Sequence, residues 1–280
     1  MHNAKGYLTC FCSKDLSDVG IMLIFVAQKQ LKNITMDYQD FELKEYVSVN
    51  ERQWSVSEAF PVLMRKVYLW MTMALAITGF TAYGVATSPG IRQTIYSNSA
   101  VMWGLVIAEL ILVITVSGAI NRLSLSVATL LFIVYSVLNG ALLSSVFLVY
   151  TASSVATVFF ITAGTFAAMA LIGYTTKTDL SSMGKILLMA LIGMIIATIV
   201  NIFVKSTGLE LIISYIGVLV FVGLTAYDSQ KIKQMLLQAP DASEGAQKVA
   251  ILGALSLYLD FITCSFTCSV SLVEEIDKNA

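Results

Sequence analysis

The sequence predicts an all-α membrane protein, a seven-transmembrane helix bundle. Composition is the first reason: 57% of the 280 residues are hydrophobic and 12% are charged, which is about half the charged fraction of a soluble domain. The second reason is a series of apolar runs from Val67 onward, each close to the roughly 20 residues that a helix needs to cross a bilayer. The third is the placement of lysine and arginine, which are frequent in every second connection and rare in the others.

The first 60 residues precede these runs and are polar and mixed in charge. We expect residues 1–60 to form a poorly ordered cytosolic tail. Met36 offers a second start position, so we draw no function from the segment before it. Cys10 and Cys12 alone are weak evidence for a metal site, and His2 is the only histidine, which excludes histidine-based catalysis. No basic cluster is present that would bind nucleic acid.

Seven spans follow, in a membrane domain that we place at 61–272, before a short acidic tail at 273–280. The expected spans are 67–86, 101–120, 127–149, 155–174, 186–204, 211–230 and 249–270. Their connectors are short, so neighbouring spans should pack as antiparallel helices. Small residues inside the spans let helices approach closely in lipid and are expected to mark packing faces. These residues are Gly79, Gly84, Gly164, Gly193, Gly217, Gly223 and Gly253.

The orientation follows from the basic residues, which are more frequent on the cytosolic side of membrane proteins. With the N-terminus inside, the inner segments hold Arg65, Lys66, Arg122, Lys177, Lys185, Lys231, Lys233 and Lys248. The outer segments hold only Arg92, Lys205 and Lys278. We therefore expect a cytosolic N-terminus and, after seven crossings, a C-terminus outside.

Three acidic residues of the eighteen in the chain fall inside the expected spans: Glu109, Asp228 and Asp260. No lysine or arginine lies in the interior of any span to neutralise them. An ionised carboxylate at membrane depth is costly unless it is paired, so each of the three is a candidate functional residue. The helix that carries Asp260 has one small and polar face, which also includes Gly253, Ser256, Thr263 and Thr267.

Asp228 would lie roughly a dozen ångströms shallower than Asp260 if its helix ended at Lys231, given a rise of about 1.5 Å per residue. The residues after Lys231 remain compatible with an amphipathic helix. We therefore predict that the helix continues to about Leu237, with Lys231 and Lys233 extending their ammonium groups toward the cytosol. This extension brings the two carboxyls to a similar depth, nearer the cytosolic side.

Two carboxyls brought together in a low dielectric cannot both ionise cheaply, so Asp228 and Asp260 should share a proton and respond to pH as a pair. When ionised they offer oxygen ligands to a hard cation such as Ca²⁺, although two carboxylates make only a weak, transit-type site. The alternative is that each aspartate forms a hydrogen bond with the backbone, Tyr227 or Tyr258 and only fixes the packing. Glu109 either joins the ion path or pairs with a hydroxyl such as that of Thr115 or Tyr135.

Four motifs within about residues 60–265 are specific when taken together. They are Ala226-Tyr227-Asp228-x-Gln230-x-Ile232-Lys233, Ser256-Leu257-Tyr258-Leu259-Asp260-Phe261-Ile262, Tyr135-Ser136-Val137-Leu138-Asn139-Gly140 with Ser144-Ser145, and Gly173-Tyr174-Thr175-Thr176-Lys177-x-Asp179-Leu180. On these motifs the chain resembles the Bax inhibitor-1 family, the transmembrane Bax inhibitor motif proteins, and especially its bacterial members.

The resemblance implies a seven-helix bundle with the last helix central, wrapped by the other six. It also implies a pH-sensitive calcium leak channel controlled by Asp228 and Asp260, with Ca²⁺ as the transported ion and no other cofactor. Eukaryotic relatives moderate cell death by adjusting stored calcium, and some bacterial relatives bind a membrane-bound quality-control protease. The resemblance to bacterial members favours a bacterial inner membrane.

The sequence departs from this family in two places. Bacterial members carry an arginine at the inner end of span two that latches onto the acid pair, and the matching position here is Ile120. Arg122 lies two residues further on and is the candidate substitute for this gate latch. The second departure is the polar run Thr263-Cys264-Ser265-Phe266-Thr267-Cys268-Ser269, where the family continues with leucine.

Two other functions compete with the channel. An intramembrane aspartyl protease also places two aspartates on consecutive helices, but its Gly-x-Gly-Asp and Pro-Ala-Leu motifs are absent from this sequence, so we expect no enzyme. The stronger competitor is a non-conducting regulator that binds another membrane protein, such as a quality-control protease. Apart from such a protein, the expected partners are the lipid bilayer and calcium ions, with no nucleic acid.

Overall fold

The computed structural model describes residues 59–149, 151–204, 206–237 and 243–279. The predicted cytosolic tail, including Cys10 and Cys12, lies outside the described residues. The helices are α3 (Ala59–Thr87), α4 (Pro89–Ser97), α5 (Ser99–Gly118), α6 (Leu125–Leu143), α7 (Val146–Val149), α8 (Ala152–Thr175), α9 (Ser181–Val204), α10 (Thr207–Leu237) and α11 (Glu244–Asn279). Seven helical segments in this part of the chain are long and apolar enough to cross a membrane. The predicted all-α fold with seven spans is confirmed.

Two local features depart from a simple series of spans. The short helix α4 connects the first two spans, with Pro89 at its start, where a missing N–H is tolerated. The third span is interrupted between α6 and α7. The Ser144 and Ser145 hydroxyls donate there to the backbone carbonyls of Ala141 and Leu142, at 2.6 and 3.0 Å. Serine side chains that bond to nearby carbonyls compete with helical hydrogen bonding, which explains the interruption.

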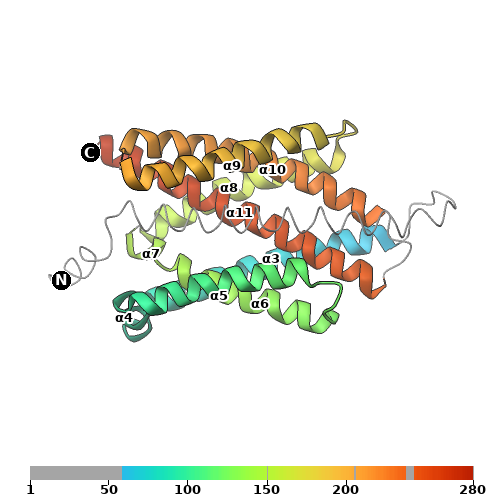
Figure 1. The fold of residues 1–280 in the computed structure, drawn as a ribbon, viewed down its shortest axis with the longest axis horizontal. Helices are drawn as coiled ribbons and strands as arrows, with labels where there is room; N and C mark the ends of the chain where they lie inside the picture. Colours follow the sequence, from blue (N-terminus) through green and yellow to red (C-terminus); the bar gives the residue numbers. More distant parts are fainter. Residues whose placement is uncertain (1–58, 150, 205, 238–242, 280) are drawn as a thin grey trace.

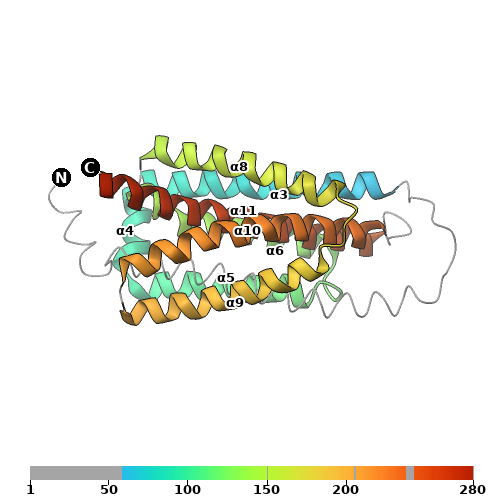
Figure 2. The ribbon, with the colours of Figure 1, turned by 90° about the horizontal axis from the view of Figure 1, so that it is seen from above.

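Helix α11 lies between two groups of helices (Figure 1). Helices α3, α5 and α6 pack together on one side, and α8, α9 and α10 on the other. Of the most apolar 18-residue stretch of α11, 89% is buried inside the bundle, against 50% or less in the other six spans. The last helix is therefore central. In the view at right angles, α10 and α11 run side by side (Figure 2).

Two glycines permit very close helix packing. A Cβ atom on Gly140 of α6 would lie 2.6 Å from the Thr78 carbonyl oxygen of α3. A Cβ atom on Gly173 of α8 would overlap the Ala226 carbonyl group of α10. In both places only a residue without a side chain lets the two backbones touch.

The prediction that the glycines in the spans mark packing faces is only partly right. Gly223 and Gly253 do pack closely, against Leu187 and Ile232. Four others are exposed, and a Cβ atom on them would meet nothing within 4 Å. These four are Gly79, Gly84, Gly164 and Gly193. The sequence could not separate the two groups, because a lipid-facing surface and a helix-facing surface are both apolar.

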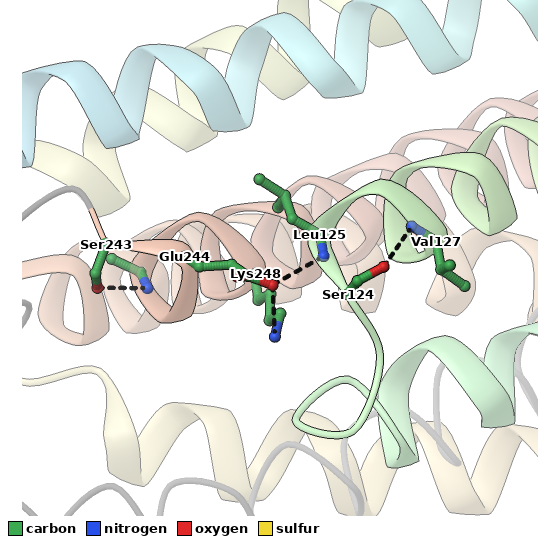
Figure 3. A network of polar contacts seen from close by, with 7 residues as sticks. Ser124, Leu125, Val127, Ser243, Glu244 and Lys248 are labelled. Atoms are coloured by element: carbon green, nitrogen blue, oxygen red, sulfur yellow. Dashed lines mark hydrogen bonds and ion pairs between the residues drawn. The ribbon is translucent and has the colours of Figure 1, made fainter.

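The start of α11 is tied to its neighbours at the predicted cytosolic end of the bundle (Figure 3). Glu244 Oε1 accepts a hydrogen bond from the Leu125 backbone N–H at 3.1 Å and forms an ion pair with Lys248 at 3.1 Å. A carboxylate suits this place because the first turn of α6 exposes N–H groups and the positive end of the helix dipole. In addition, Lys66 of α3 donates to Gln247 Oε1 at 2.9 Å. These bonds fix the position of α11 against α6 and α3.

Candidate functional site

The predicted acid pair lies where α10 and α11 pack against each other. Asp228 on α10 is 3% exposed and Asp260 on α11 is 0% exposed. The Ser256 hydroxyl, one turn before Asp260 on α11, donates a hydrogen bond to Asp228 Oδ2. A side chain of α11 thus holds the Asp228 carboxyl against the central helix.

A second contact establishes the register of the two helices. A Cβ atom on Gly253 would lie 3.1 Å from Ile232, so Gly253 faces Ile232 as Ser256 faces Asp228. The helices are therefore antiparallel, and Asp260 lies level with the turn of α10 that precedes Asp228. The two carboxyls occupy levels about 6 Å apart along the bundle, the rise of one helical turn.

The predicted continuation of α10 past Lys231 is confirmed, because the helix extends to Leu237. Lys233, in this continuation, donates from Nζ to the Tyr174 carbonyl oxygen at 2.7 Å and lies 5.1 Å from the centre of the Tyr174 ring. Tyr174 is in the last turn of α8, where backbone carbonyls lack helical partners and attract cations. Lys233 therefore stabilises the end of α8.

Tyr258 does not form the hydrogen bond with an aspartate that the packing alternative predicts. Its hydroxyl shares a hydrogen bond of 2.7 Å with Thr78 Oγ1, and Thr78 in turn donates to the Ser136 carbonyl oxygen at 3.0 Å. Since a threonine hydroxyl has one proton, Tyr258 is the donor to Thr78. The Tyr258 ring packs edge-on against Phe132 and Tyr135. Tyr258 thus connects α11 to α3 and α6, and its proton is not directed to an aspartate.

Glu109 on α5 is 0% exposed and lies near the polar contacts of Tyr258 described above. Its carboxyl lies near the hydroxyls of Tyr135 and Tyr258. Thr115, the other hydroxyl near it in the sequence, donates instead to the Ile111 carbonyl oxygen of its own helix. Within the described residues, no three histidine, cysteine or acidic side chains gather closely enough to hold a metal ion. Glu109 therefore does not complete a three-carboxylate site with Asp228 and Asp260.

Gln230 fastens the loop between α8 and α9 to α10. Its Nε2 donates to the Thr178 carbonyl oxygen at 2.8 Å, and its Oε1 accepts from the Leu180 N–H at 2.8 Å. One side-chain amide thus satisfies one donor and one acceptor of the loop backbone. Gln230 is two residues from Asp228, so the helix that carries the acid also holds this loop. We call the contact of Gln230 with Thr178 and Leu180 the loop clamp.

The same loop is also held from its other side. Asp179 Oδ1 accepts hydrogen bonds from the Ser181 hydroxyl at 2.6 Å and from the Ser181 N–H at 2.9 Å. These bonds, with the hydroxyl as the larger cause, lower the pKa of the Asp179 carboxyl below its ordinary value. Asp179 is thus a stable carboxylate at the start of α9, where the helix dipole favours a negative charge.

Removing the clamp should loosen this loop. Gln230→Ala breaks two half-buried hydrogen bonds and is expected to lower the free energy of unfolding by about 1–3 kcal/mol. Hydrogen exchange at the Leu180 amide should become faster, which mass spectrometry of the purified protein in detergent can measure. Gln234→Ala, at an exposed position one turn further along α10, is the control and should change neither quantity. Unchanged exchange at Leu180 in Gln230→Ala would show that the clamp does not hold the loop.

Arg122 lies in the exposed turn between α5 and α6, and Ile120 of the same turn is 1% exposed. Among the described residues the Arg122 side chain forms no ion pair with Asp228 or Asp260. In this conformation Arg122 therefore does not hold the two aspartates in the way that a latch residue would. The turn is nevertheless coupled to the central helix, since Leu125, which follows it, is bonded to Glu244 of α11.

The polar run Thr263–Ser269, in the C-terminal half of α11, is packed inside the bundle. Thr263 is 0% exposed and Thr267 is 1% exposed. Their hydroxyls donate to the carbonyl oxygens of Leu259 and Thr263, one turn earlier in the same helix. A threonine that bonds to its own helix is less polar toward its surroundings, which lets this sequence occupy a buried position.

Sequence reasoning selected Asp228 and Asp260, which are both buried, but missed the contacts of Ser256 and Gln230. The sequence places Ser256 on a polar face and in a motif, and Gln230 in a motif, but it indicates no partner for either. The available signal was an amide at the end of a span, close in sequence to a buried acid. Its partners could not be inferred because they lie about 50 residues earlier.

Comparison with known proteins agrees with this architecture. A sequence model described as "Inhibitor of apoptosis-promoting Bax1" matches residues 61–264. "Inner membrane protein YbhL" of Escherichia coli strain K12 is 51% identical over 201 residues, covering 71% of this chain and 86% of its own. An uncharacterized protein of Borreliella burgdorferi is 44% identical over 199 residues, covering 71% and 86%. "Uncharacterized protein RP147" of Rickettsia prowazekii is 42% identical over 201 residues, covering 71% and 84%.

Seven membrane-length helices, a buried central helix and buried carboxyls on the last two spans define an integral membrane protein with acidic side chains inside its helix bundle. The family match covers most of this region. The chain belongs to the Bax inhibitor-1 family.

Proposed function

We propose that this protein is a pH-sensitive calcium leak channel in which Asp228 and Asp260 share a proton and gate the path. The observation that carries the proposal is the burial of two carboxyls on adjacent core helices, at levels about one turn apart. Buried acids without a neutralising lysine or arginine are costly, and their usual roles in membrane proteins are proton relays and ion pathways.

The chemistry of the pair fits a transported ion better than a bound one. Two carboxylates supply at most four oxygen atoms, and the Ser256 hydroxyl adds one more near Asp228. Ca²⁺ takes about six to eight oxygen ligands, so water would complete its shell at this place. Such a site holds the ion weakly and releases it readily. Protons compete for the same oxygens, which makes passage depend on pH.

Other residues have supporting roles in this proposal. Glu109 is a second acidic position on the path, on the other side of α11 from Ser256. Arg122 serves as the latch only if the α5–α6 turn moves inward. We place the protein in a bacterial inner membrane with its N-terminus in the cytosol, which agrees with the placement of basic residues and with the printed name of the E. coli relative.

Purified protein in calcium-loaded liposomes tests the proposal. We expect Ca²⁺ efflux above that of protein-free liposomes, with a rate that changes across an acidic-to-neutral pH series. Potassium-loaded liposomes examined in parallel measure the selectivity for calcium. Efflux no greater than that of empty liposomes at every pH would exclude the channel and favour the non-conducting regulator, since no partner protein is present in this system.

A further inference from the structure

Two cysteines on α11 lie outside the acid pair and the loop clamp. Cys264 and Cys268 are four residues apart on a continuous helix, a spacing that places side chains on one face about 5–6 Å apart at Cβ. Their thiols lie close enough to interact with each other. Both cysteines are free, so the sulfur atoms meet as thiols and not as a disulfide.

The surroundings of this thiol pair form a partly enclosed site. Cys264 is 4% exposed, whereas Cys268 is half-buried and nearer the outer end of the helix. From the facing helix α8, Thr162, which is 1% exposed, lies near the Cys268 thiol. Asp260 lies one turn before Cys264, on the same side of α11. The two cysteines thus lie where α11 packs against α8, and Cys268 is the more exposed of the two.

The number of sulfur ligands selects the kind of ion. Structural zinc requires four ligands, and the described residues hold no group of three or more histidine, cysteine or acidic side chains suited to a metal. Soft monovalent ions, Cu(I) and Ag(I), prefer thiolate sulfur and are stable with two such ligands. A monovalent ion that replaces one thiol proton also leaves the site electrically neutral, which suits its burial.

We propose that Cys264 and Cys268 form a two-sulfur binding site for a soft monovalent metal ion, Cu(I) or Ag(I), between α11 and α8. The site is distinct from the proposed calcium path. It does not depend on ion conduction, so the failure of either proposal leaves the other standing.

Binding of Ag(I) to the full-length protein in chloride-free detergent solution tests the site. The parent for this experiment is Cys10→Ser/Cys12→Ser, which removes the two cysteines of the N-terminal segment. We expect one silver ion per chain after desalting, measured by elemental mass spectrometry. Bound silver should also protect both remaining thiols from maleimide, as intact mass shows. Two silver ions per chain, or protection of only one thiol, would contradict a shared site.

Single substitutions separate a shared site from two independent thiols. Cys264→Ala and Cys268→Ala should each weaken silver binding by more than about tenfold, since even the loss of a supporting group costs a metal site that much. Alanine is used because a buried free cysteine packs like a small apolar residue. Ser265→Ala, in the same turn but without sulfur, is the control and should bind as the parent does. Affinity that survives either cysteine substitution overturns the proposal.

Discussion

Asp260→Asn should make calcium efflux from liposomes insensitive to pH. Asparagine has the shape of a protonated aspartate and no titratable proton, so position 260 stays neutral at every pH and can no longer share a proton with Asp228. At every pH its efflux should equal that of the unmodified protein at the acidic end of the series. The measurement is Ca²⁺ release with an indicator dye, at equal amounts of reconstituted protein.

Asp228→Asn removes the other carboxyl of the pair, the one on α10, and is tested with the same efflux measurement. Because a shared proton belongs to both carboxyls, this variant should have the same flat profile, and the double variant should add no further change. Asp179→Asn is the control, since Asp179 is exposed in the α8–α9 loop, and it should keep the normal pH response. An Asp260→Asn profile that follows the unmodified protein would exclude gating by the pair.

Gly173→Ala should markedly destabilise the protein. The new Cβ atom would overlap the carbonyl carbon, the carbonyl oxygen and the Cα atom of Ala226. These are backbone atoms of α10 and cannot rotate away as a side chain could. Overpacking a buried contact costs typically about 1–3 kcal/mol, and a backbone neighbour places this substitution at the upper end. A lower melting temperature of the purified protein in detergent is the expected result.

Gly164→Ala is the matched control on the same helix. Gly164 is exposed, and a Cβ atom there would meet nothing within 4 Å. Alanine is a better helix former than glycine by about 0.5–1 kcal/mol, so this variant should be as stable as the unmodified protein or slightly more stable. Equal melting temperatures for the two alanine variants would contradict the close approach of α8 and α10.

The sequence was sufficient for the features that depend on one helix at a time. Apolar length predicts each span, and the amphipathic residues after Lys231 predict the extension of α10 to Leu237. The buried acids were identifiable because a charge inside an apolar run is an exception whatever its neighbours are.

Features that depend on how helices rotate and pack against each other could not be predicted from the sequence. Gln230 and Ser256 are ordinary polar residues until their partners, Thr178 and Asp228, are known. The turn that holds Arg122 is exposed because Ile120 takes the buried position in it. Hydropathy does not report which residue of a turn faces inward, so a latch could be suggested but not located.

The contact between Gly173 and Ala226 has a mechanical consequence. Backbones that touch leave no side chains between them to absorb sliding, so α8 and α10 should move as one rigid block, and the loop clamp adds the start of α9 to it. The contact of Asp228 with Ser256 then lies at the boundary between this block and the central helix. If the proposed gating is right, we expect a proton gained or lost there to displace the block against α11 and not one side chain alone.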